Sequence, residues 1–177
     1  DKVLHESKYK DEIIKEYGQT FLDEIEINLK TFDPKIKDLL KQEIDLKNEY
    51  TKLTAGAKIS YEGKDYNLAG LGPFHSDVNR NIRKKSYEAR YGWFKDNENE
   101  LDDIYDKLVK LRHKIATTLG YDNFIELGYY RMGRSDYGPK EVASFRRQIV
   151  DHVVPIVTKL HEQKKEILGL DELYFYD

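Results

Sequence analysis

Apolar residues recur every three or four positions through most of the chain, a spacing that is typical of amphipathic helices. The clearest run covers residues 101–119 and ends at Gly120, a common helix stop. Earlier helices are predicted over residues 2–17 and 21–30. Asp33 followed by Pro34 is a strong start signal for a further helix to about Thr54. The predicted fold class is mainly α, with long antiparallel helices.

One stretch departs from the helical period. Residues 58–68 alternate between apolar and polar positions on either side of Gly63 and Lys64, which predicts one small β-hairpin that turns at this pair. An isolated two-stranded hairpin is only marginally stable, so we expect it to pack on the helices or to continue a sheet elsewhere. Ser76 and Asp77 are the predicted cap of the next helix, and the polar residues 96–100 are expected to break or bend it.

A last long helix is predicted to open at Gly138 and Pro139 and to end at Gly169. Pro155 falls inside it and cannot donate a backbone hydrogen bond, so a kink is expected near residues 151–154.

The order of these signals suggests two portions, N-terminal helical hairpins over residues 1–54 and the hairpin plus long helices over residues 55–177, packed together as one unit. The chain begins at Asp1 and ends on an apolar run, Leu173–Asp177. We interpret it as a piece of a longer polypeptide.

Charge and composition narrow the function classes. The 33 acidic and 30 basic residues give a net charge of −3 and are interspersed, so no basic stripe favours nucleic acid as a partner. The longest uncharged apolar run, Val153–Val157, falls far short of the ~20 residues needed to cross a membrane. The start of the chain has no secretory pattern and there is no cysteine, which favours a reducing, cytoplasmic location.

The sequence offers no complete catalytic or metal site. The five histidines are scattered, and no two lie three or four positions apart, as ligands on one helix face would. Residues 161–164 match the first four positions of the zinc motif H-E-x-x-H, beginning at His161. The fifth position is Lys165 where the motif needs its second histidine, and a lysine there would repel a cation. Catalytic residues and metal ligands are therefore predicted to be absent from this chain.

Residues 121–138 are rich in tyrosine, arginine and glycine and lie between two long helical patterns. Arginine offers planar paired donors for carboxylates and tyrosine offers rigid area with a polar tip, which together suit recognition of a peptide. The alternative is a packed corner in which the arginines pair with acids such as Glu126 and Asp136. The candidate residues of a substrate channel are Tyr129, Arg131, Arg134 and Tyr137.

Several sequence blocks resemble one known family. They are I-S-Y-E-G-K-D-Y-N-L, N-I-R-K-K-S-Y-E-A, L-V-K-L-R-H-K-I-A-T-T-L-G-Y-D-N-F, Y-Y-R-M-G-R-S-D-Y, V-A-S-F-R-R-Q-I and L-G-L-D-E-L-Y-F-Y-D. In this order they resemble oligoendopeptidase F, a family of zinc metallopeptidases in the thimet-oligopeptidase group. The resemblance covers about Lys58 to Asp177 and is most specific from Arg112 to Tyr137.

The resemblance implies a mostly helical enzyme that encloses a channel and hydrolyses short oligopeptides. Its zinc would be held by H-E-x-x-H and a downstream glutamate, with the motif glutamate activating water. Those motifs are absent from this chain, and in the family they follow the matched region. We therefore expect zinc in the parent enzyme, a catalytic domain beyond this segment, and no activity or cofactor in the chain alone. The alternative hypothesis is a free-standing helical protein-interaction module without enzymatic activity.

Overall fold

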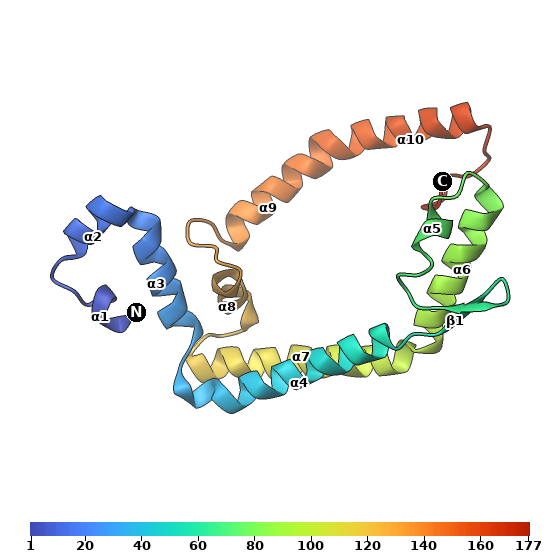
Figure 1. Cartoon of the computed structure of the whole chain (residues 1–177). Coiled ribbons are helices and arrows are strands. Elements are labelled where there is room, and N and C mark those ends of the chain that lie inside the picture. Colours follow the sequence, from blue (N-terminus) through green and yellow to red (C-terminus); the bar gives the residue numbers. More distant parts are fainter. The chain divides into compact units, whose positions relative to one another are not determined.

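The computed structural model describes residues 1–177 and is built almost entirely from helices with one small hairpin, which confirms the predicted fold class (Figure 1). The chain divides into two compact units. Unit 1 contains residues 1–43 and 109–154, and unit 2 contains residues 44–108 and 155–177. None of the helices combines the length and the apolar character that a membrane span needs.

Unit 1 is a helical assembly around a compact apolar core. Its elements are α1 (Lys2–His5), α2 (Lys10–Tyr17), α3 (Gln19–Thr31), η1 (Pro34–Ile36), the first part of α4 (Lys37–Ala55), the last part of α7 (Glu98–Leu119), α8 (Phe124–Arg131), α9 (Pro139–Gln148) and the π-helical turn η2 (Ile149–Val153). The core side chains are Leu22, Ile25, Ile27, Ile36, Leu39, Leu111, Ile115, Ala116 and Leu127. The predicted start at Asp33 is confirmed, because its carboxylate accepts the backbone N–H of Lys35 at 2.8 Å.

Unit 2 combines the hairpin with the remaining helices. Its elements are β1 (Ile59–Tyr61), β2 (Lys64–Tyr66), α5 (Gly72–His75), α6 (Arg80–Asp96), the rest of α4 and α7, and α10 (Val154–Leu168), whose first residue belongs to unit 1. As expected, the hairpin does not stand alone. Ile59 and Tyr61 are buried with Leu71 and pack against side chains of α5 and α6, among them Phe74 and Trp93.

The hairpin turns one residue earlier than predicted. Tyr61 pairs with Lys64, so the two turn residues are Glu62 and Gly63 rather than Gly63 and Lys64. Both have positive φ, +52° and +77°, the conformation that a tight hairpin turn requires in order to match the twist of its strands. A lysine at the second turn position would have to adopt the conformation that glycine takes at no steric cost.

The start of α6 also differs from the prediction. The helix begins at Arg80 with Asn79 as its cap, because the Asn79 side chain accepts the N–H of Asn81 at 2.9 Å. Asp77 instead accepts the N–H of Asn79 at 2.7 Å and shapes the turn that precedes the helix. The expected break at residues 96–100 is confirmed, since α6 ends at Asp96 and α7 begins at Glu98.

The kink predicted at Pro155 takes the form of a π-helical turn. Residues Ile149–Val153 are wound more loosely than an α-helix, immediately before the proline. Because proline lacks a backbone N–H and its ring crowds the carbonyl four residues earlier, the preceding turn has to widen. The helix then continues to Leu168, and Gly169 ends it with φ +62°.

Candidate functional site

The stretch over residues 121–138 is not a simple connection, because it contains α8. The Asn123 side chain accepts the N–H of Ile125 at 2.8 Å and caps the start of this helix. Leu127 is completely buried and anchors the helix in the core of unit 1. After Arg131 the chain leaves the helix and turns at Gly133, whose φ is +70°. The four candidate residues therefore lie at the end of α8 and on the loop that follows it.

Arg131 is held by a buried carboxylate on α4. Its Nη2 donates to Glu43 Oε2 at 2.7 Å, while Arg112 Nε on α7 donates to Glu43 Oε1 at 2.8 Å. The Glu43 side chain is only 2% exposed. The guanidinium carbons of Arg112 and Arg131 each lie 5.7 Å from the centre of the Phe124 ring. This cluster joins α4, α7 and α8 and fixes the orientation of Arg131.

Glu43 and Arg112 are the residues of this cluster that the sequence reasoning missed. They lie 69 positions apart, and no local pattern links them. One signal was present nonetheless. Glu43 lies four positions after Leu39 and seven positions after Ile36, a spacing that puts the three side chains on one face of a helix. An acid therefore occupies the apolar face. A charged residue at such a position needs a partner, which Arg112 and Arg131 provide.

Arg134 has a different environment. Its guanidinium carbon lies 4.7 Å from the centre of the Tyr129 ring and 5.3 Å from that of Tyr137, so two aromatic rings hold the cation. Among residues 1–177 no carboxylate lies within ion-pair distance of it. The packed-corner alternative expects the arginines to pair with acids such as Glu126 and Asp136, and Arg131 does pair with an acid, Glu43. In the structure Glu126 accepts the Tyr130 hydroxyl at 3.1 Å instead.

A cavity of about 300 Å³ lies beside Arg134. Its lining includes Tyr129, Tyr137, Asp136 and Glu141. Glu141 Oε2 accepts the backbone N–H of Gly138 at 2.9 Å, and this hydrogen bond lowers the pKa of the carboxyl. The cavity thus combines aromatic walls, a cation without a salt-bridge partner, and carboxylates.

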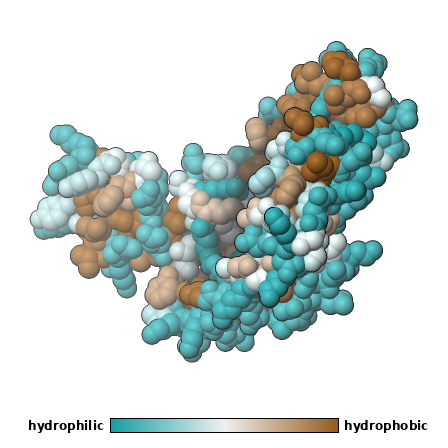
Figure 2. Space-filling model, turned by 45° about the vertical axis from the view of Figure 1, so that its right-hand side comes forward, coloured by the Kyte–Doolittle hydropathy of each residue, from teal (hydrophilic) through white to brown (hydrophobic).

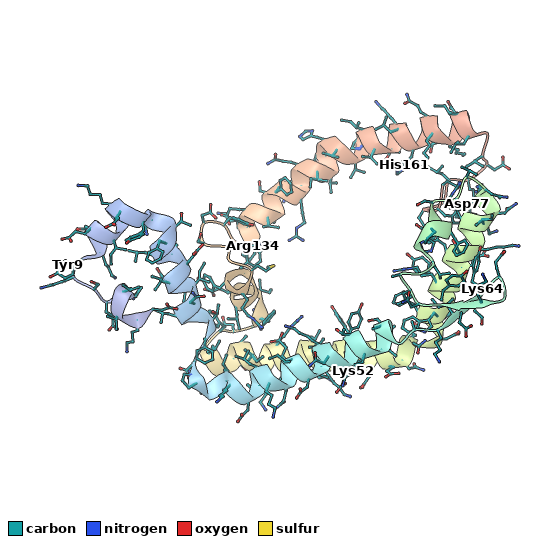
Figure 3. The ribbon with its side chains drawn as sticks, in the orientation of Figure 1. Tyr9, Lys52, Lys64, Asp77, Arg134 and His161 are labelled. Atoms are coloured by element: carbon teal, nitrogen blue, oxygen red, sulfur yellow. The ribbon has the colours of Figure 1, made fainter.

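Arg131 opens onto a second cavity of unit 1, of about 480 Å³, whose lining includes Glu24, Asn28 and Tyr130. The structure therefore brings three of the four candidates, Tyr129, Arg134 and Tyr137, into one cavity and places Arg131 in another. Figure 3 shows Arg134 on the loop that follows α8.

Packing between α3 and α8 holds this region in place. The Tyr121 hydroxyl donates to the backbone carbonyl of Lys30 at 3.1 Å, and burial raises the pKa of that hydroxyl. The Lys30 ammonium lies 4.8 Å from the centre of the Tyr130 ring and forms an ion pair with Glu26 at 2.6 Å. Tyr121, before α8, and Tyr130, within it, therefore both hold this segment against Lys30 of α3.

Unit 2 carries an aromatic cavity of about 440 Å³ that the sequence did not single out. Tyr87 and Tyr91 of α6 line it together with the segment Tyr174–Tyr176. Arg80 holds the end of that segment, because its Nε donates to Asp177 Oδ1 at 2.6 Å and its Nη2 donates to Oδ2 at 3.0 Å. These hydrogen bonds lower the pKa of the Asp177 carboxyl.

The described residues, 1–177, contain no group of three or more histidine, aspartate or glutamate side chains that could hold a metal ion. His161 projects from the exposed α10, and Figure 3 shows it there.

Comparison with known proteins places the chain among peptidases. Residues 74–177 match the profile of Peptidase family M3. An oligoendopeptidase F homolog of Borreliella burgdorferi is 27% identical over 104 residues, which is 59% of this chain and 17% of that protein.

Solved structures agree over nearly the whole chain. PZ peptidase A, solved with an inhibitor, is 43% identical with a TM-score of 0.93, and the match covers 99% of this chain and 31% of that one. An oligoendopeptidase F from Bacillus anthracis is 41% identical with a TM-score of 0.91, covering 99% of this chain and 32% of that one. The chain thus spans about a third of the length of these solved relatives. It belongs to peptidase family M3, together with the relatives named oligoendopeptidase F.

Proposed function

We propose that this chain is the helical, non-catalytic portion of a longer zinc metallopeptidase that hydrolyses short peptides. One observation carries the proposal: 43% identity and a TM-score of 0.93 across 99% of the chain, to a peptidase of which the chain covers 31%. Identity at this level over a complete helical arrangement supports a shared role for the segment within the larger protein. A cytoplasmic location is proposed from the lack of cysteine.

The zinc ligands and the general base are proposed to lie in the part of the polypeptide outside this chain. The sequence has no H-E-x-x-H, and its histidines lie far apart along the chain. When bound, zinc would polarise the scissile carbonyl and lower the pKa of the attacking water. This chain would contribute binding surface and a rigid frame around the peptide.

Within this frame, Tyr129, Arg134 and Tyr137 are the proposed peptide contacts. The two rings fix the guanidinium of Arg134 without using its hydrogen-bond donors, which remain available for peptide carbonyl groups. Arg131 has a supporting role, because its bond to the buried Glu43 positions the end of α8, from which the loop with Arg134 starts.

The proposed activity is tested with internally quenched fluorescent peptides of about five to ten residues. The assay compares the isolated chain with the longer polypeptide that contains it. We expect hydrolysis by the longer polypeptide, loss of that hydrolysis with a zinc chelator, and no hydrolysis by the isolated chain. A longer polypeptide that folds, binds zinc and cleaves no peptide contradicts the proposed function.

The proposed peptide contact is tested by Arg134→Gln in the longer polypeptide. Loss of one or two charge-assisted hydrogen bonds should raise KM by roughly 3- to 30-fold, because each such bond contributes on the order of 1 kcal/mol. Arg146→Gln on the exposed side of α9 is the matched control and should leave KM unchanged. Equal KM values for the two variants exclude Arg134 from peptide binding.

The second candidate function, a free-standing interaction module, is favoured by one observation, the exposed apolar side chains of α10. Such a module would act through this helix and would show no peptidase activity in any longer form. The hydrolysis assay separates the two candidates.

A further inference from the structure

α10 exposes apolar side chains in its first part, residues 154–160, and at its end, Ile167 and Leu168. None of its residues, Val154–Leu168, is buried. Ile156 is 60% exposed, Leu160 56% and Ile167 83%. Figure 2 shows hydrophobic side chains gathered at the top of the view, where α10 lies. Single exposed leucines are ordinary on a protein surface, but a helix with all of its large apolar residues in solvent is not.

These residues lie on one side of the helix. At about 100° per residue, the arc from Ile156 to Leu168 spans about 120° and also contains Leu160, Val157 and Ile167. One charged residue, Lys164, lies within this arc, and its long apolar stem can carry the ammonium group to the edge of the face. The opposite side holds the charged residues Lys159, Glu162, Lys165 and Glu166. An apolar stripe of this width is the pattern of a helix that packs against other protein on one side and faces water on the other.

We propose that the apolar face of α10, formed by Ile156, Val157, Leu160, Ile167 and Leu168, docks against the part of the same peptidase polypeptide that lies outside this chain. The proposal rests on the proposed function and names the partner of this helix. The comparison supports it: relatives of the same fold contain this segment as 31% of their length, so about two thirds of such a polypeptide is available to cover the face. The charged side of α10 would remain in water.

The test places two glutamates on the face, Ile156→Glu with Leu160→Glu, in the isolated chain and in the longer polypeptide. The control is Lys159→Glu on the charged side, which alters the net charge by the same −2. In the isolated chain, where the face is exposed, both variants should keep the melting temperature within about 2 °C of the parent sequence. In the longer polypeptide, the double variant should lower it by about 5 °C or more, and the control should not.

Leu160→Ala provides a milder change in case the double variant of the longer polypeptide does not fold. It should lower the melting temperature of the longer polypeptide by about 3 °C or more and leave that of the isolated chain unchanged. Equal effects of Leu160→Ala in the two proteins overturn the proposal. A dimer of the isolated chain in sedimentation equilibrium that the double variant dissociates also overturns it, because the partner is then a second copy.

The docking proposal and the proposed function fail in different ways. If the longer polypeptide cleaves no peptide but still shows the selective loss of stability, the docking face stands and the peptidase function falls. If the longer polypeptide cleaves peptides and tolerates glutamates on α10, the docking face is wrong and the function stands.

Discussion

The buried carboxylate of Glu43 offers the most direct test of how unit 1 is held together. Glu43→Gln keeps the size of the side chain but removes its charge and replaces one acceptor oxygen with the NH2 of an amide, which only donates hydrogen bonds. That amide would face a guanidinium of Arg112 or Arg131, donor against donor. Arg112 and Arg131 each form an ion pair with the Glu43 carboxylate, and both would lose it.

The size of the effect follows from the exposure of the three side chains. Removing one partner of a fully buried ion pair costs about 3–5 kcal/mol. Here the carboxylate is 2% exposed, but Arg112 and Arg131 are 36% and 25% exposed, so water partly compensates them. We therefore expect a loss of about 2–3 kcal/mol in the free energy of unfolding. For a chain of this length that corresponds to a fall in melting temperature of roughly 5–10 °C.

The assay is thermal and urea unfolding followed by far-ultraviolet circular dichroism, with hydrogen exchange of α8 as the local readout. Glu49→Gln is the control, because Glu49 lies exposed on the same helix and should change stability by less than about 0.5 kcal/mol. A double-mutant cycle with Arg131→Met should show a coupling of about 1 kcal/mol or more. Equal stability of the Glu43 and Glu49 variants, or zero coupling, would show that the Glu43 carboxylate does not stabilise unit 1 through its arginines.

Two further predictions concern unit 2, and urea unfolding followed by Trp93 fluorescence measures both. Burial lowers the pKa of His75, whose Nε2 has no partner and whose ring stacks on Tyr87 at 4.0 Å. The folded state therefore favours neutral His75, so the free energy of unfolding should fall as the pH drops below about 6.5, the pKa of histidine in the unfolded chain. His75→Phe should make this fall smaller. An unchanged pH dependence in the variant would show that His75 does not cause it. Glu62 occupies a turn position with φ +52° that asparagine tolerates better, so Glu62→Asn should raise the free energy of unfolding by about 0.5–1 kcal/mol, and a decrease would contradict this account of the turn.

Local signals in the sequence were enough to predict most of the helices. The cap at Asp33, the proline that disturbs the last helix and the glycines that end helices act within a few residues of where they stand. The alternation that predicts the hairpin is likewise a local pattern. The turn lies one residue earlier than predicted, because glutamate at position 62 does not indicate the positive φ that Glu62 adopts.

The sequence reasoning missed α8 because its composition resembles that of a loop. Gly128 and two adjacent tyrosines weaken the helical pattern, and the helix depends on tertiary packing of Leu127 and on its cap at Asn123. In the structure a side chain at Gly128 would meet the Phe124 ring at 3.3 Å, so glycine keeps space for the ring that contacts both arginines. Such a requirement is visible only once the elements have been brought together.

The candidate site shows the same division between local and long-range information. Sequence alone indicated arginine and tyrosine in one region, but it could not separate Arg131 from Arg134. Glu43 lies 88 positions from Arg131, and this distant contact gives the two arginines different environments. Long-range pairing of charges depends on how helices pack, which no local spacing specifies.

This chain is proposed to support a zinc peptidase whose metal and catalytic groups lie outside it. The most direct test is the zinc content of the purified isolated chain and of the longer polypeptide, measured by mass spectrometry after removal of loosely bound metal. We expect about one zinc per longer polypeptide and none on the isolated chain. Stoichiometric zinc that remains on the isolated chain would contradict it.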